Sequence, residues 1–309
     1  MQDMIFACDD FPTCGQTVMA RLSIGQGGKG SNQAIACGRL GIPTMFIGAV
    51  GRDSFAQKIR AFYRREKIGC RLRLKPDEAS GTAVILVNRD GQNEIVIEPG
   101  ANGRLSPADI PRSVFRHARV VVGQLEANYA ATAHALRTAR AAGATTLLNP
   151  APMRADFGAA LLKHVDILIP NETEFVALVR QLPGIKLGKF NEAALHALSK
   201  AQLHALCRKF KLPTLIITMG EKGCFVSSKD GHHFIPAHTG IKVVDTTGAG
   251  DAFCGGLAAG LIRFSGDIVA AARLGNAVAA LSITKPGAAY SMPTRAELHR
   301  FYPTFTFRG

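Results

Sequence analysis

The sequence lacks the cysteine spacing that a zinc site or a disulfide framework requires. Its seven cysteines lie far apart, and none of them forms a C-x-x-C pair. An odd number of widely spaced cysteines argues against a disulfide-stapled secreted protein and is typical of a reducing compartment. We therefore expect a cytoplasmic protein.

Long apolar runs are also missing. No run approaches the ~20 apolar residues of a membrane-spanning helix. The first residues do not show a charged region followed by an apolar signal core. These absences predict no association with a membrane.

Acidic residues are in the minority, because 37 Lys and Arg face 23 Asp and Glu, for a net charge of +14. The basic residues are scattered and form no stripe interleaved with aromatic side chains, so we expect no nucleic-acid partner. A positive field suits a small polyanionic substrate such as a nucleotide equally well.

Apolar segments that read as strands alternate with segments that read as helices. Strands are predicted at 44–50, 120–123, 145–148, 165–169 and 214–218, with helices at 33–40, 53–67 and 127–142 between them. This alternation predicts a mostly parallel sheet covered by helices on both faces. The antiparallel strands near 81–97 look like a small appended lid. No linker is visible, so we expect a single domain over residues 1–309.

The stretch from Asp245 to Phe253 has the features of a phosphate site. An apolar run ends at Asp245, and glycines at 248 and 250 precede a helix predicted over 252–262. Amides at a helix N-terminus attract anions, and Asp251 beside them could accept a proton from an attacking hydroxyl. Capping and turn preferences explain the same residues equally well, so both interpretations remain open at this point.

A second glycine pattern favours a different class of enzyme. Residues 25–30 match G-x-G-x-x-G, the fingerprint of dinucleotide-binding oxidoreductases. The match is weak, because residues 20–24 make a poor buried strand and no tight strand–turn–helix unit is apparent. It is not a P-loop either, since Lys29 is followed by Gly30 and not by Ser or Thr.

Polar clusters follow several predicted strands directly, at 124–126, 149–152, 171–174 and 219–223. Ligands of α/β proteins gather at the carboxyl ends of parallel strands, so these clusters predict one composite site. Each cluster alone could be an ordinary loop. Asn171 with Glu174 three residues later is also a capping box.

Taken together, these motifs resemble the ribokinase family, the PfkB carbohydrate kinases. The resemblance spans essentially the whole chain. It rests on residues 27–34, 99–102, 124–126, 149–152, 170–174, 218–223, 245–253 and 284–288. It implies an α/β ribokinase-like three-layer sandwich, with a mostly parallel sheet flanked by helices and a small β lid from about 13–25 and 80–98.

The resemblance implies ATP-dependent phosphorylation of a pentose, expected to be D-ribose at its 5-hydroxyl. Asp251 would be the general base, and the amides of Gly248, Ala249 and Gly250 would form the anion hole. A kinase for deoxyribose, another sugar or a nucleoside remains an alternative, as does a non-catalytic sugar-binding relative. The residues expected to hold the sugar are Asp3, Gly28, Lys29, Gly30, Ser31, Asn32, Glu126 and Asp251.

The resemblance also implies ATP, Mg²⁺ and K⁺ as cofactors and a homodimer formed through the lid. Glu174 would act on magnesium through water. Residues expected at the nucleotide are Asn171, Thr218, Met219, Gly220, Glu221, Lys222, Gly223, Gly250, Asp251 and Asn276. Residues expected at potassium, several through main-chain carbonyls, are Asp245, Thr247, Ser282, Lys285, Gly287 and Ser291.

One departure from the family pattern concerns the start of the chain. The family begins with a strand and an Asn-x-Asp turn, whereas here Asp3 matches the aspartate and Met1 stands at the asparagine position. The first strand is apparently missing, which would leave backbone groups of its neighbours unpaired. We expect that the start is misassigned or the chain truncated, and that restoring the strand would raise stability.

Overall fold

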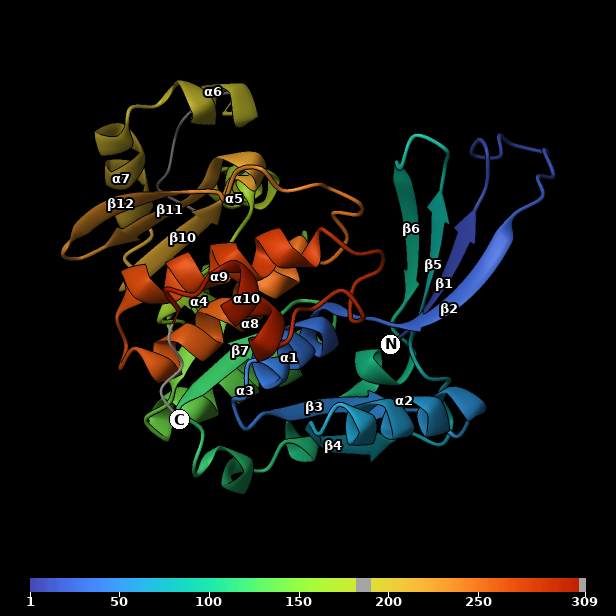
Figure 1. Cartoon of the computed structure of the whole chain (residues 1–309). Helices are drawn as coiled ribbons and strands as arrows, with labels where there is room; N and C mark the ends of the chain where they lie inside the picture. Colours follow the sequence, from blue (N-terminus) through green and yellow to red (C-terminus); the bar gives the residue numbers. More distant parts are fainter. Residues whose placement is uncertain (182–189, 306–309) are drawn as a thin grey trace.

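The main sheet contains six strands. The computed structural model describes residues 1–181 and 190–305. Strands β7 to β10 run parallel, and β11 and β12 extend the sheet antiparallel (Figure 1). In spatial order the strands are β12 (Gly231–Pro236), β11 (Gly223–Ser228), β10 (Thr214–Thr218), β9 (Ile167–Leu168), β8 (Thr145–Leu148) and β7 (Val120–Gly123).

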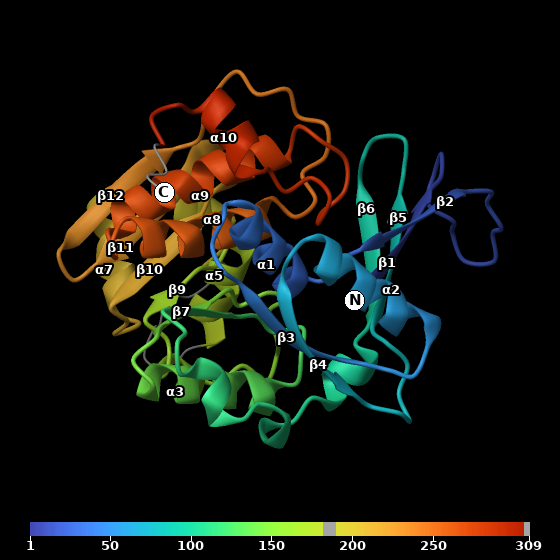
Figure 2. The ribbon, with the colours of Figure 1, turned by 60° about the horizontal axis from the view of Figure 1, so that its bottom comes forward.

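The two faces of this sheet carry different helices, because successive strand residues point to opposite sides. Leu147 and Ile216 join a core cluster with α1, α8 and α9, whereas Leu148 and Leu215 join a second cluster on the other face. Figure 2 shows the helices around these strands. The first face is covered by α1 (Lys29–Arg39), α8 (Ala249–Arg263) and α9 (Ile268–Ser282). The second is covered by α3 (Tyr129–Ala141), α4 (Ala159–Leu162), α5 (Glu172–Gln181), α6 (Glu192–Ala197) and α7 (Lys200–Arg208). The expected three-layer architecture is confirmed.

Helix α8 packs unusually close to its neighbours. A Cβ atom on Gly255 would lie 2.5 Å from the Cβ of Ala36 in α1, and one on Gly260 would lie 2.6 Å from the Cα of Ala271 in α9. Glycine at these positions lets the three helix backbones approach each other.

The lid is a separate four-stranded sheet that stands beside the helical layers in Figure 1. Its order is β2 (Arg21–Gln26), β1 (Gln2–Ala7), β5 (Thr82–Val87) and β6 (Asn93–Glu98). The expected range 80–98 contains β5 and β6. The expected range 13–25 contains most of β2 and the loop before it, but it omits β1.

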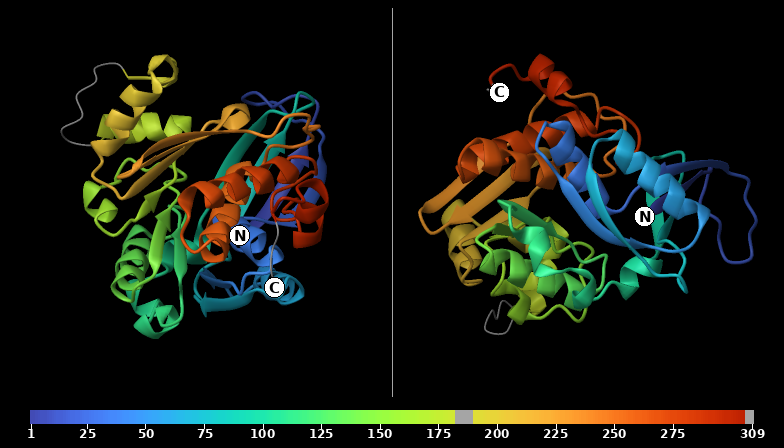
Figure 3. Two further views of the ribbon diagram at one scale, coloured as in Figure 1. Left: turned by 60° about the vertical axis from the view of Figure 1, so that its left-hand side comes forward. Right: turned by 90° about the horizontal axis from the view of Figure 1, so that it is seen from below.

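A third, two-stranded sheet pairs β3 (Met45–Val50) with β4 (Gly69–Leu74) in parallel. In the part of the chain that the structure describes, β3 and β7 each have a strand partner on one side. They pack against the adjacent helices α1 and α8, and Figure 3 shows both regions. The strand expected before Met1 would lie beside β3 and β7. That this strand is missing stays a prediction.

The remaining elements mostly follow the predicted segments. The helix predicted over 33–40 begins earlier, at Lys29 in α1, and part of the region predicted as helical at 183–213 lies outside the described residues. Within the described residues, no helix combines the length and hydrophobicity needed to cross a membrane. The other elements are α2 (Ser54–Arg65), α10 (Arg295–Phe301) and the 3-10 turns η1 (Gly100–Arg104), η2 (Pro107–Asp109), η3 (Arg112–Phe115) and η4 (Gly220–Lys222).

Candidate active site

The N-terminus of α8 depends on the left-handed backbone of Gly248. Its φ is 79°, and a Cβ there would lie 3.1 Å from the Cβ of Ala288, so glycine is required for two reasons. The amide of Ala249 donates to Thr246 O at 3.1 Å. The amide of Gly250 lies in the first helical turn, where the helix offers no acceptor for it, and the space beside Gly250 is open. This end of α8 can receive an anion.

Asp251 is buried at the start of the same helix, with 5% of its surface exposed. Its Oδ2 accepts a hydrogen bond from Asn32 Nδ2, and its Oδ1 accepts one from Gln33 Nε2, both at 2.9 Å. Burial raises the pKa of Asp251, while the charge of Lys29 and the two hydrogen bonds act to lower it. The carboxylate is therefore fixed in direction and desolvated.

Gln33 was absent from the expected site residues although it contacts the expected base. It also accepts a 2.6 Å hydrogen bond from Gln124 Nε2 through its Oε1. Its position directly after Asn32 in the glycine-rich motif was the signal available in the sequence.

The glycine-rich turn before α1 brings Asp3 into the site. A Cβ on Gly27 would lie 1.8 Å from Asp3 Oδ2, so only glycine leaves room for the carboxylate. Asp3 is buried, and burial raises its pKa to about 6. The turn joins lid strand β2 to α1, so a strand–turn–helix unit exists here, contrary to our sequence-based interpretation. Because β2 is an antiparallel lid strand, this unit is still not the parallel βαβ unit of a dinucleotide fold.

Glu126 follows β7 and reaches the same turn from the opposite side. Its Oε2 accepts a 2.7 Å hydrogen bond from the amide of Lys29. Burial raises the pKa of Glu126 to about 7, against the opposing charge of Lys29. A small cavity here is lined by the 27–31 turn, residues 46–48 of β3, and Gln124 and Glu126. The carboxylate of Glu126 and the backbone of the glycine-rich turn thus border one small space.

The charge of Lys29 acts on both Glu126 and the expected base. Burial acts to lower the pKa of Lys29, but the carboxylates of Asp251, Glu126 and Glu174 together raise it. A protonated ammonium is therefore held among three acidic groups.

The loops after β9 and β10 lie side by side, because Asn171 forms a parallel bridge with Thr218. Asn171 and Glu174 form the predicted capping box: the Asn171 amide donates to Glu174 Oε2 at 2.9 Å, and the Glu174 amide donates to Asn171 Oδ1 at 2.7 Å. Burial raises the pKa of Glu174. Asn171 and Glu174 therefore cap the start of α5, whether or not they also bind a ligand.

The expected nucleotide residues include two with clear structural functions. Met219 is buried in the second core cluster, and Asn276 Nδ2 donates to the carbonyls of Ile235 and Pro236, each at 3.2 Å. In the 218–223 loop, the amide of Met219 donates to Gly223 O at 2.8 Å, which closes a tight turn that includes Gly220 and Glu221.

His196 in α6, which the sequence did not single out, links the two loops. Its Nδ1 accepts from Lys222 Nζ at 3.1 Å, and its Nε2 lies 3.0 Å from Glu172 Oε1.

Asp245 connects the two segments expected at potassium. One carboxylate oxygen accepts from the amide of Thr247 and the other from the amide of Gly287, both at 2.8 Å. These hydrogen bonds outweigh burial and lower the pKa of Asp245. The Lys285 ammonium forms an ion pair with Glu297 and not with Asp245.

The atoms that could bind a cation at these loops are oxygens. The hydroxyls of Ser282 and Ser291 donate to the carbonyls of Ala279 and Ala288, at 2.8 and 2.9 Å. Among residues 1–181 and 190–305, no group of three or more His, Cys, Asp and Glu side chains could hold a metal ion. An ionised carboxylate with main-chain carbonyls fits a hard cation such as K⁺ and does not fit a transition metal.

Comparison with known proteins gives a family match. Residues 1–295 match the pfkB family of carbohydrate kinases. The chain is similar to a ribokinase of Staphylococcus aureus, with 35% identity covering 89% of this chain and 87% of the relative. It is also similar to a deoxyribokinase of Salmonella typhi, with 33% identity covering 97% of this chain and 95% of the relative.

Solved structures show the same fold over nearly the whole chain. The ribokinase of Giardia lamblia superposes with a TM-score of 0.88 at 30% identity, covering 99% of this chain and 96% of that one. The Arabidopsis thaliana ribokinase complexed with ribose and ATP gives a TM-score of 0.81 at 27% identity, covering 97% and 95%.

Proposed function

Because the chain belongs to the pfkB family of carbohydrate kinases and is an ATP-dependent sugar kinase, we propose that it phosphorylates D-ribose at the 5-hydroxyl. The observation that carries this proposal is the placement of Asp251. It is buried at the N-terminus of α8 and oriented by Asn32 and Gln33 toward the turn that meets Asp3 and Glu126.

The proposed reaction is an in-line phosphoryl transfer. The sugar hydroxyl oxygen forms a bond to the γ-phosphorus of ATP, the bond to the ADP oxygen breaks, and the hydroxyl proton moves to Asp251. The amide of Gly250 and the positive end of α8 stabilise charge on the transferring group. The raised pKa of Asp251 brings its basicity nearer to the working pH.

The sugar occupies the polar space between the 27–32 turn and Glu126. Carboxylates of Asp3 and Glu126 accept hydrogen bonds from sugar hydroxyls, and the glycines at 28 and 30 allow close approach of the backbone. A Cβ on Gly30 would lie 2.7 Å from Gln124 Oε1, so a larger residue there would displace the Gln124 side chain.

The nucleotide lies over the 171–174 and 218–223 loops, with Lys29 near its phosphates. The partly buried carboxylate of Glu174 fits an outer position near magnesium, which would supply neutralisation of phosphate charge. The oxygen set around Asp245 fits potassium and would keep the neighbouring α8 N-terminus in place.

A homodimer through the lid is proposed from its exposed apolar side chains. Met19 in the lid loop is 92% exposed and Val96 in β6 is 71% exposed, with Leu22, Ile24, Ile95 and Ile97 also exposed. The strand registers place Leu22, Ile24 and Val96 on one face of the lid sheet, and exposed apolar side chains gathered on one face mark an interaction surface.

Similarity to deoxyribokinases favours 2-deoxy-D-ribose as the second candidate substrate. The two sugars differ by one hydroxyl, which a hydrogen-bonding site distinguishes strongly. A coupled assay of ADP formation with D-ribose, 2-deoxy-D-ribose and adenosine measures the choice. We expect the highest kcat/KM for D-ribose; a higher value for either other substrate would overturn this assignment.

A further inference from the structure

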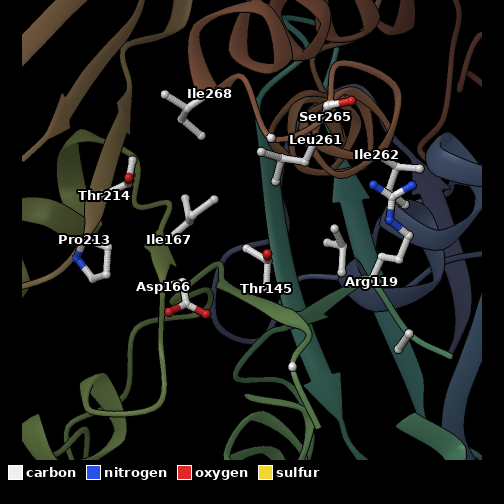
Figure 4. Close-up of a pocket in the computed structure, with 14 residues that line it drawn as sticks. Arg119, Thr145, Asp166, Ile167, Pro213, Thr214, Leu261, Ile262, Ser265 and Ile268 are labelled. Atoms are coloured by element: carbon white, nitrogen blue, oxygen red, sulfur yellow. The ribbon is translucent and has the colours of Figure 1, made fainter. Parts of the chain in front are cut away.

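A cavity of about 500 Å³ lies at the edge of the main sheet opposite to the candidate active site (Figure 4). The amino ends of β7, β8, β9 and β10 form its wall, whereas the candidate site uses residues that follow the carboxyl ends of these strands. The end of α8, with Leu261 and Ile262, and the start of α9, with Ile268, complete it. Its volume is within the range of ligand pockets, roughly 300–1,000 Å³.

The lining combines apolar walls with free hydroxyl groups. Thr145, Thr214 and Ser265 line the cavity, and their hydroxyls have no hydrogen bond within residues 1–181 and 190–305. Val120, Ile167, Leu261, Ile262 and Ile268 supply the apolar part. A molecule with an apolar body and a few acceptor atoms would match this lining.

The charge that remains unbalanced at the cavity is positive. Arg119 is exposed at its rim, and over the described chain its guanidinium has neither a hydrogen bond nor an ion pair. Asp166 also lines the cavity, but its carboxylate already accepts from Arg140 Nε at 3.0 Å and from the amide and hydroxyl of Thr146 at 2.9 and 2.8 Å. A bound carboxylate or phosphate would therefore pair with the guanidinium of Arg119.

We propose that this cavity binds a small organic anion with an apolar part, held by Arg119 at the rim and by the Thr145, Thr214 and Ser265 hydroxyls inside. The site is separate from the candidate active site and does not depend on the sugar that the enzyme phosphorylates.

Binding of phenyl phosphate and of benzoate, followed by calorimetry and by ligand-observed NMR, tests this proposal. We expect both probes to bind the unmodified protein and an Asp251→Asn variant alike. Inorganic phosphate, which has no apolar part, should bind at least tenfold more weakly. Equal binding of inorganic phosphate, or loss of probe binding in Asp251→Asn, would overturn the proposal.

Two variants locate the site. Arg119→Gln should weaken probe binding about tenfold, the size of one charge-assisted hydrogen bond. Arg116→Gln, a nearby exposed arginine outside the cavity lining, is the matched control and should bind as the unmodified protein does. Thr214→Phe should fill the cavity and abolish binding. Unchanged binding in Arg119→Gln would refute the site even if Thr214→Phe failed to fold.

Discussion

Gln33 Nε2 donates a 2.9 Å hydrogen bond to Oδ1 of Asp251. The same side chain accepts from Gln124 Nε2, so a strand-end residue and the proposed base are connected through one amide. A hydrogen bond to a carboxylate favours its charged form.

Replacing Gln33 should therefore shift the pH dependence of activity. In Gln33→Met the pKa of Asp251 rises, so the base stays protonated to a higher pH and activity is lost on the acid side. We expect the acid limb of the kcat/KM profile to move up in pH. Gln57→Met, at an exposed position of α2, is the control; identical profiles for both variants would exclude this function for Gln33.

Asp251→Asn should lower kcat by about 10²–10⁴-fold, the usual effect of losing a general base. ATP binding should change little, because the proposed anion site at the N-terminus of α8 remains. Steady-state kinetics and nucleotide titration measure the two effects separately. Near-normal turnover would remove Asp251 from the mechanism.

Glu126→Gln should flatten the dependence of stability on pH. Burial raises the pKa of Glu126 to about 7 in the folded protein, above its ordinary value of 4.5. Its contribution to the free energy of unfolding is therefore complete below about 4.5 and is lost as pH rises toward 7. Glutamine does not ionise, so the difference between pH 5 and pH 8 in urea denaturation should shrink by on the order of 1–3 kcal/mol. Glu221→Gln, exposed in the 218–223 loop, is the comparison variant.

Potassium should raise the melting temperature of the protein more than lithium does, because a ligand that binds the folded state stabilises it. Asp245→Asn removes the charged oxygen between the two loops and should abolish most of this difference. Asp156→Asn, on an exposed carboxylate, should retain it. Equal effects of both cations on the unmodified protein would contradict a potassium site.

An apolar strand added before Met1 should raise the free energy of unfolding. β3 and β7 each have an unoccupied pairing side within the described chain, and a strand supplies the missing hydrogen bonds there. A glycine–serine extension of equal length is the control. Identical denaturation of the two extended proteins would contradict the prediction of a missing strand.

The layers of the fold could be predicted because strand alternation and helix spacing are local signals. Strands at 120–123, 145–148 and 214–218 were placed at their observed bounds. Strand β4 was not predicted, because it is exposed along most of its length and burial gives its sequence only a weak pattern. The division into three sheets could not be predicted either, because it depends on long-range pairing.

Residues of the site were predictable where glycine and carboxylate motifs carry them, as in the 27–32 turn and the 245–251 stretch. His196 could not be found this way, because its contacts with Glu172 and Lys222 join three segments that are distant in sequence. Asn276 donates a hydrogen bond to the end of β12, and this contact between distant segments could not be predicted from the sequence either.

The close approach of α8 to α1 and α9 reverses an ordinary rule of helix stability. Replacing a helical glycine with alanine normally gains up to about 1 kcal/mol. At Gly255 or Gly260 the added methyl would collide with Ala36 or Ala271, so the same replacement would force the helices apart. Attempts to stabilise this enzyme by removing glycines should therefore leave α8 untouched, because its weak helix formers set the position of Asp251.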